Sequence, residues 1–423
     1  MKQIPLSSVN SEVKYTIGGL NTVTQANYQS DDIVRGHFLY SLTYDYSDHN
    51  TRIYRSGTNQ KNITYSKHDF WCKLLDGGHT QTLTTMWQSY FNDSEWLLVG
   101  FDYFTPYYKA QYMKHSNDPK HTKLPTRWAN SILCLPVSIN DANQKGTVIL
   151  DYSHYKQITG LNELMQKVGN LNKIKLPKSL IDPYQNYSSN YIPDEILKNR
   201  YLPSTVDPDA NHIYIPSTEH DSYDDATTLY RSECGISSDG TYMFFAMNDN
   251  HRNLYVARFP VANIRNDLIN KDTIDISTYN LDKSNTLAIS YTNLCQLTSQ
   301  SRFSFQGFGM DSENNFYISS EFANDYPDNP ESSLTDMQPR FIVKIPNMTN
   351  NIYTWELVDL TNYKPFKHMY TSYDGTYLDE ITEFESVQVV GVNDILLTVA
   401  YHKGLEYDEK RSKRKSVIYE ITW

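Results

Sequence analysis

The sequence predicts an all-β protein, a five-bladed β-propeller whose blades each contain four antiparallel strands. Long periodic helices are scarce, and short runs rich in Val, Ile, Tyr, Phe and Thr alternate with turns of Asp, Asn, Gly and Ser. One unit recurs five times: a polar residue followed by two apolar strands around a short turn. Five such units can close into a ring, which removes the exposed edges of an open sheet.

The fifth unit, in the last part of the chain, has this pattern most clearly. Glu385 and Gln388 lie in an apolar strand, residues 391–394 contain turn-forming Gly, Asn and Asp, and a second apolar strand ends at His402. Two apolar strands around so short a turn predict a β-hairpin. The chain ends after a third strand of this unit, so we expect an N-terminal strand near 12–17 to supply the fourth strand and close the ring.

The other four units are looser copies of the fifth. In the first unit, the polar residues 29–32 predict the turn and residues 34–44 the second strand. In the fourth unit, the run 352–360 predicts the fourth strand. We therefore predict one propeller domain over residues 1–423. The polar residues that open the first four units are Gln25, His79, Glu233 and Gln306.

The number of residues between His79 and Glu233 exceeds the number between other successive openings by about the length of one blade. The excess lies in 151–226, which is rich in Pro, Asn, Tyr and Asp and has an amphipathic patch at 161–168. We interpret this segment as a large, partly helical insertion after the second blade. A smaller insertion at 105–128 is the most basic loop of the chain, and it is either a solvated loop or a site for an anionic polymer.

Charge and composition argue against several classes of protein. The 423 residues carry a net charge of −11, so nonspecific nucleic-acid binding is not expected. Four cysteines without a Cys-x-x-Cys pair indicate buried thiols rather than a zinc site or a disulfide framework. No run reaches the ~20 apolar residues of a membrane span, and the first residues lack the apolar core of a Sec signal peptide. We expect a monomer that leaves the cell by another route.

The polar residues at the strand openings are the candidate functional site. The first strand of each propeller blade lines the central channel, so its opening residues gather at one channel mouth. Amide and carboxylate oxygens there can bind a polyhydroxyl ligand, a phosphodiester or a calcium ion, with Glu233 and Glu385 as candidate metal ligands. The alternative, that these side chains only bridge blades and hold water, stays open. The candidate ligand-binding residues are Gln25, His79, Gln81, Glu233, Gln306, Glu385, Gln388 and His402.

No catalytic motif accompanies this ring of residues. The chain contains no Gly-x-Ser-x-Gly, no His-Glu-x-x-His and no Walker loop. If the protein is an enzyme, His79 is the expected acid or base, and Glu233 or Glu385 is its partner. The 35 tyrosines suit a sugar-binding surface, but an AT-rich genome would produce the same enrichment.

Several motifs of these units resemble those of one protein family. They are Gly-Gly-His-Thr-Gln-Thr at 77–82, Ser232-Glu233 with the turn at 238–239, Gln306-Gly307, and the stretches 385–402 and 418–423. In this order they resemble the helveticin J family, the large heat-labile bacteriocins of lactic-acid bacteria. The resemblance covers most of the chain outside 151–226. It departs at Ser232, where family members carry a histidine just before the glutamate.

The resemblance implies a secreted or released protein that inhibits related Gram-positive bacteria. We therefore expect a bacteriocin-like propeller that recognises a cell-envelope carbohydrate or teichoic acid at the channel mouth. Two alternatives stay open: a propeller-type hydrolase or lyase acting on an envelope polymer, and a non-catalytic adhesion or structural propeller. The expected partner is a bacterial cell-envelope polymer, and calcium is the cofactor considered.

Overall fold

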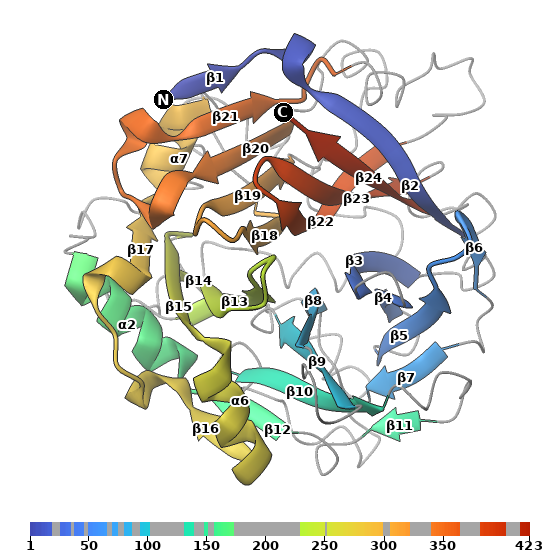
Figure 1. Cartoon of the computed structure of the whole chain (residues 1–423), viewed down its shortest axis with the longest axis horizontal. Helices are drawn as coiled ribbons and strands as arrows, with labels where there is room; N and C mark the ends of the chain where they lie inside the picture. The colour runs from blue at the N-terminus through green and yellow to red at the C-terminus, as the bar shows by residue number, and fades with distance from the viewer. Residues whose placement is uncertain are drawn as a thin grey trace, which may run out of the picture.

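Five small β-sheets are arranged in a ring in the computed structural model (Figure 1). The structure describes residues 1–18, 26–34, 38–45, 50–65, 70–74, 80–86, 94–101, 131–138, 148–150, 156–172, 229–249, 252–298, 305–321, 340–363, 381–402 and 415–423. The predicted five-bladed propeller is confirmed by this arrangement.

Each blade contains four strands, and each strand is antiparallel to its neighbours. The first blade contains β3 (Ala26–Val34), β4 (Phe38–Asp45), β5 (Asn50–Gly57) and β7 (Phe70–Leu74). The second contains β8 (Thr80–Met86), β9 (Ser94–Phe101), β10 (Ser131–Ser138) and β12 (Lys156–Thr159). The third contains β13 (Leu229–Ile236), β14 (Tyr242–Asp249), β15 (Leu254–Pro260) and β17 (Thr286–Ile289). The fourth contains β18 (Gly307–Met310), β19 (Phe316–Glu321), β20 (Arg340–Ile345) and β21 (Glu356–Asp359). The fifth contains β22 (Ile381–Gly391), β23 (Asp394–His402), β24 (Lys415–Thr422) and β2 (Asn10–Gly18).

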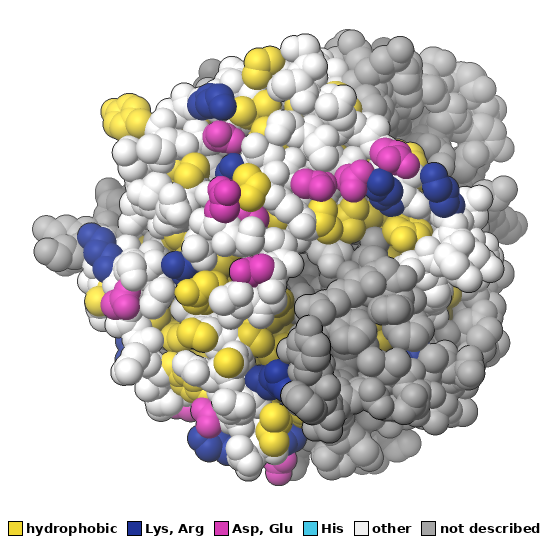
Figure 2. Space-filling model, viewed as in Figure 1, with side chains coloured by type: hydrophobic (Ala, Val, Ile, Leu, Met, Phe, Trp, Pro, Cys, Tyr) yellow, Lys and Arg dark blue, Asp and Glu magenta, His cyan; other side chains and the backbone are white. Residues whose placement is uncertain are grey.

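The N-terminal strand β2 is the fourth strand of the fifth blade. It pairs with β24 from Asn10–Thr422 to Ile17–Ser416. Lys14 Nζ lies 2.7 Å from Glu420 Oε2 across this pair, and this hydrogen bond raises the pKa of Lys14. Figure 2 shows acidic and basic side chains side by side over these strands. Because exposed ion pairs contribute little, the buried apolar contacts of β2 are expected to dominate closure.

Four sheets carry a fifth strand, which the sequence did not predict. These short strands join in parallel to the fourth strand of the preceding blade. Three of them lie in the chain between the third and fourth strands of their own blade, and β1 precedes β2, the fourth strand of the fifth blade. Neighbouring blades are therefore interlocked by main-chain hydrogen bonds at their outer edges. The strands are β6 (Asn62–Thr64), β11 (Val148–Leu150), β16 (Thr273–Asp275) and β1 (Lys2–Ile4).

In the fourth blade, two short 3-10 helices occupy the corresponding connection. They are η8 (Pro346–Met348) and η9 (Ile352–Thr354). The predicted strand 352–360 is therefore wrong at its start, because β21 begins only at Glu356. The side chain of Asn351 accepts a hydrogen bond from the Tyr353 N–H at 3.2 Å, which starts a helical turn there.

Helix α2 (Leu161–Asn172) packs against β15 and β17 of the third blade. Its buried residues recur at helical spacing, as the amphipathic patch predicted: Leu161, Leu164, Met165 and Val168. Strand β12 lies inside the segment predicted as an insertion, but it pairs with β10 and belongs to the second blade. The segment 173–228 and the basic loop 105–128 lie outside the described residues.

Five hydrophobic clusters of the described residues lie between neighbouring blades. The second strand of each blade contributes to the clusters on both of its faces. In β9, for example, Leu97 packs toward the first blade and Leu98 toward the third. This burial on both sides explains why these strands are nearly continuous apolar runs.

The first blade corrects one sequence prediction. Residues 29–32 were expected to form a turn, but they lie within β3, where Ser30 pairs with Leu42 and Asp32 with Tyr40. The buried run 39–43 of β4 offers a long ladder of main-chain partners, which outweighs the turn preference of the polar residues in β3. Strand β3 therefore continues to Val34, which pairs with Phe38.

The smaller elements cover the outer parts of the ring. They are η1 (Leu6–Ser8), α6 (Val261–Asn270), η6 (Ile276–Thr278), η7 (Lys283–Asn285) and α7 (Tyr291–Thr298). Among the described residues, we find no helix with the length and hydropathy that a membrane crossing requires.

Closure of the ring by β2 leads to a prediction about the stability of the protein. Ile17 is fully buried between the fifth and first blades, so Ile17→Ala should lower the free energy of unfolding by about 2–5 kcal/mol in a denaturant titration. Val13 lies on the same strand but is 42% exposed, so Val13→Ala should change it by less than about 0.5 kcal/mol. Equal effects of the two substitutions would contradict closure through the buried face of β2.

Candidate functional site at the openings of the first strands

The first strands of the five blades form the innermost layer of the ring. Each of them, β3, β8, β13, β18 and β22, contacts the first strands of both neighbouring blades. They surround the centre of the molecule in Figure 1. Their side chains are thus placed near one another although they are far apart in the sequence.

Four of these strands contain an irregularity near their openings, and three of the bulged residues are Gln or Glu. The register shifts at Gln29, Gln81, Tyr230 and Glu385, each of which lacks a directly opposed partner. A bulge turns its side chain out of the normal alternation and is common beside functional sites.

Gln29 is a residue that the sequence prediction missed. The prediction placed the first opening at Gln25, which lies outside the described residues. A shared serine could have found Gln29, because Ser30 follows it just as Ser386 follows Glu385. His79, the predicted opening residue of the second blade, also lies outside the described residues, whereas Gln81 lies in β8.

Glu233 is a buried carboxylate, only 2% exposed, on β13. Arg231, two residues earlier on the same strand, forms an ion pair with Glu233 through its Nη2 atom. Its Nη1 atom donates a hydrogen bond of 2.8 Å to the carbonyl oxygen of Phe305, just before β18. Arg231 therefore neutralises the buried charge and ties the third blade to the fourth. The sequence prediction did not identify this residue.

Gln306 directly precedes β18, whereas Glu385 lies within β22, and both are buried, at 8% and 5% exposure. Glu233 and Glu385 were predicted to open their strands, but each is the fifth residue of its strand, since β13 begins at Leu229 and β22 at Ile381. The Gln306 N–H donates to the carbonyl oxygen of Ser319 at 3.0 Å, which fixes the entry to β18. Gln388 is half-buried further along β22. His402 lies at the end of β23 and pairs with Ile381 at the start of β22. The structure thus places Glu233 and Glu385 within the first strands of the third and fifth blades, and Gln306 directly before that of the fourth.

Glycines allow these strands to approach closely. A Cβ atom on Gly307 would lie 2.6 Å from the Val387 backbone nitrogen and 2.8 Å from the Ser386 Cα atom. A Cβ atom on Gly100 of β9 would lie 2.7 Å from the Ser232 carbonyl oxygen. Both contacts are with backbone, which cannot yield easily. These glycines therefore set the spacing of blades at the candidate site.

The thiol next to the site is inert. Cys234 is buried, and burial, followed by the nearby Cys134 and Glu233, raises the pKa of its thiol well above the usual value. A neutral thiol is a poor nucleophile and a poor metal ligand. Cys72 and Cys134 are also buried, as the sequence predicted for all four thiols, whereas Cys295 is only half-buried.

The donor set gives limited support to a metal ion. The described residues contain no group of three or more His, Cys, Asp or Glu side chains placed to hold one. Arg231 already supplies the positive charge beside Glu233. A cation near Glu385 would need further oxygen ligands, because calcium takes about six to eight.

Gly307→Ala tests the close approach of the fourth and fifth blades. The added methyl group would overlap the backbone of β22, so we expect a loss of about 1–3 kcal/mol in unfolding free energy. Gly18→Ala is the matched control, because a Cβ atom there meets nothing within 4 Å. It should be neutral or stabilising by up to about 1 kcal/mol. If both variants melt alike, the spacing does not depend on Gly307.

Arg231→Met tests the buried ion pair. Removal of the guanidinium leaves the Glu233 carboxylate buried without its counter-charge, so we expect a loss of about 3–5 kcal/mol in unfolding free energy. The double variant Arg231→Met with Glu233→Gln should recover a large part of this loss. Additive losses in this double-mutant cycle would show that the two side chains do not interact.

Comparison with known proteins agrees with the resemblance noted in the sequence. A family model described as Bacteriocin helveticin-J matches residues 216–423. Bacteriocin helveticin-J of Lactobacillus helveticus is 31% identical over 127 residues, which cover 28% of this chain and 32% of that protein. The chain thus spans about a third of the length of this relative.

Two solved structures are similar only at a low level. One is a prolyl endopeptidase, with a TM-score of 0.27 and 8% identity, which covers 92% of this chain and 35% of the other. The second is Trypanosoma rangeli sialidase in complex with sialic acid, with a TM-score of 0.29 and 9% identity, which covers 100% of this chain and 60% of the other. Scores this low say nothing about the activity of this chain. Residues 216–423, close to half of the chain, thus match the helveticin J family.

Proposed function

We propose that this chain is a bacteriocin-like antibacterial protein that recognises a cell-envelope carbohydrate or teichoic acid of related Gram-positive bacteria. The observation that carries the proposal is the extent of the family match. It covers residues 216–423, which include Glu233 and Glu385 on first strands and Gln306 directly before the first strand that lies between them. The protein would act outside the producing cell, as its bacteriocin relatives imply.

The proposed binding surface is the mouth formed by the first-strand openings. Carboxylate and amide oxygens accept hydrogen bonds from sugar hydroxyls, and amide N–H groups donate to them. Tight packing between the glycines and the neighbouring backbone would hold these groups in place and so reduce the entropy lost on binding. The proposed ligand-binding residues are Gln25, His79, Gln81, Glu233, Gln306, Glu385, Gln388 and His402.

A pull-down with purified cell walls tests this proposal. Gln388→Ala removes a half-buried amide from β22 and should weaken wall binding by about tenfold, the effect of one lost hydrogen bond to a polar ligand. Gln157→Ala is the matched control, since Gln157 is equally half-buried but lies on the fourth strand of the second blade. Equal binding by both variants and the parent protein would argue against the first-strand site.

The same walls distinguish a binder from an enzyme. We expect the protein to bind walls without releasing soluble fragments, and zones of inhibition to appear on related species. Fragment release that is lost in His79→Ala would instead identify a hydrolase or lyase. Wall binding without any inhibition would favour an adhesion protein.

Calcium at this mouth is a further part of the proposal, with Glu385 and Glu233 as ligands. A bound ion stabilises the folded state by mass action. The melting temperature of the protein should therefore fall after EDTA treatment and recover with added calcium. An unchanged melting temperature would argue against a structural ion.

A further inference from the structure

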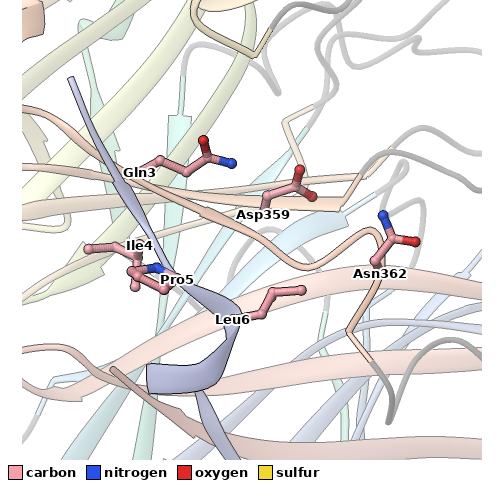
Figure 3. A pocket seen from close by; sticks show the side chains of 6 residues that line it. All are labelled: Gln3, Ile4, Pro5, Leu6, Asp359 and Asn362. Carbon is pink, nitrogen blue, oxygen red and sulfur yellow. The ribbon is translucent and has the colours of Figure 1, made fainter.

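A second concave site lies on the periphery, where the N-terminal segment meets the fourth blade (Figure 3). It is a pocket of about 280 Å³, below the roughly 300–1,000 Å³ typical of sites for drug-sized ligands. One wall comes from β1 and η1 and the other from the end of β21 and the following turn. Its lining residues are Gln3, Ile4, Pro5, Leu6, Asp359 and Asn362.

Three polar side chains of this pocket have unused hydrogen-bonding capacity. The Asp359 carboxylate accepts one hydrogen bond, from the Thr361 N–H at 2.9 Å. The Gln3 and Asn362 amides make no hydrogen bond to other described residues. In Figure 3 the amide of Gln3 extends toward Asp359, and the side chains of Asp359 and Asn362 stand beside Leu6. One acid and two amides can donate to and accept from adjacent hydroxyl groups.

The other side of the pocket is apolar and firmly held. Ile4 is buried against the cluster between the fourth and fifth blades, and Leu6 packs against the same cluster. The Lys2 N–H donates to the Trp355 carbonyl oxygen at 2.7 Å, and β1 pairs with β21 from Glu356 to Val358. A sugar ring has C–H groups on its face and hydroxyl groups around its rim. The apolar wall of the pocket suits the face, and the polar wall suits the hydroxyl groups.

The charge of the pocket selects among ligands. Its lining includes one carboxylate and no Lys or Arg among the described residues. A phosphate group would be repelled by Asp359, and a single carboxylate with two exposed amides is too few ligands for a calcium ion. A neutral ligand remains. We propose that this pocket binds one neutral sugar residue, at a second site that does not depend on the proposed mouth of the first strands.

Such binding would be coupled to closure of the ring. The pocket exists only when the N-terminal segment is docked on the fourth blade, because that segment supplies four of the six lining residues. A ligand that binds only the docked state stabilises it. The sugar should therefore raise the melting temperature as well as occupy the pocket.

Saturation-transfer NMR with N-acetylglucosamine, with glycerol 3-phosphate as the anionic comparison, tests the proposal. We expect transfer to N-acetylglucosamine in the parent protein, with millimolar affinity, and none to glycerol 3-phosphate. Asp359→Ala and Asn362→Ala should each weaken sugar binding by about tenfold and reduce the rise in melting temperature at the same sugar concentration. Asn362 is exposed, so its replacement leaves the fold intact.

Two further variants serve as controls. Asp359→Asn keeps an oxygen for the Thr361 N–H and for a hydroxyl, so it should retain sugar binding within about threefold. Asp282→Ala removes a carboxylate that likewise accepts from the N–H two residues later, at 2.7 Å from Ser284, but far along the chain in the third blade. It should leave sugar binding unchanged.

Absence of transfer in the parent protein, or equal transfer in the parent, Asp359→Ala and Asn362→Ala, would overturn the proposal. Preferential transfer to glycerol 3-phosphate would also overturn it. These outcomes are separate from the proposed function, because Gln388→Ala should weaken wall binding while it keeps transfer to N-acetylglucosamine.

Discussion

The pairing of β2 with β24 is the constraint on which the rest of the structure depends. It joins the two ends of the chain within one blade, and it places Ile17 between the fifth and first blades. Without it the fifth sheet would end at β24 with an unpaired edge, and the ring would be open at that blade. The parallel pairing of β1 with β21 extends the same N-terminal segment onto the fourth blade.

Closure and interlocking together explain how the first strands are held. Hydrophobic clusters fill the spaces between blades, and short parallel strands bind neighbouring blades at their outer edges. The first strands can then carry polar residues without loss of the fold, because the second strands bury enough apolar surface to stabilise the first strands as well as themselves. Arg231 illustrates the requirement at the centre: a buried carboxylate there is tolerated beside a partner of opposite charge.

The sequence predicted the number of blades well because each unit repeats the same polar opening and apolar hairpin. It assigned Glu233 and Glu385 to the correct first strands but placed the strand starts too late, because the polar residues before them also pair in β13 and β22; only Gln306 directly precedes its strand. It failed at 29–32, where polar composition suggested a turn but pairing with β4 decided the structure. It also missed Arg231 and the parallel strands, because an ion pair within a strand and three-residue edge strands leave no periodic signal in a single sequence.

The central claim is that the openings of the first strands bind an envelope polymer. Amide hydrogen exchange, measured with and without solubilised wall polymer, tests it most directly. The account predicts slower exchange on binding at 229–236, 305–310 and 381–388, with no change at the outer strands β7, β12 and β17. Slower exchange at the outer strands alone, with the first strands unaffected, would contradict it.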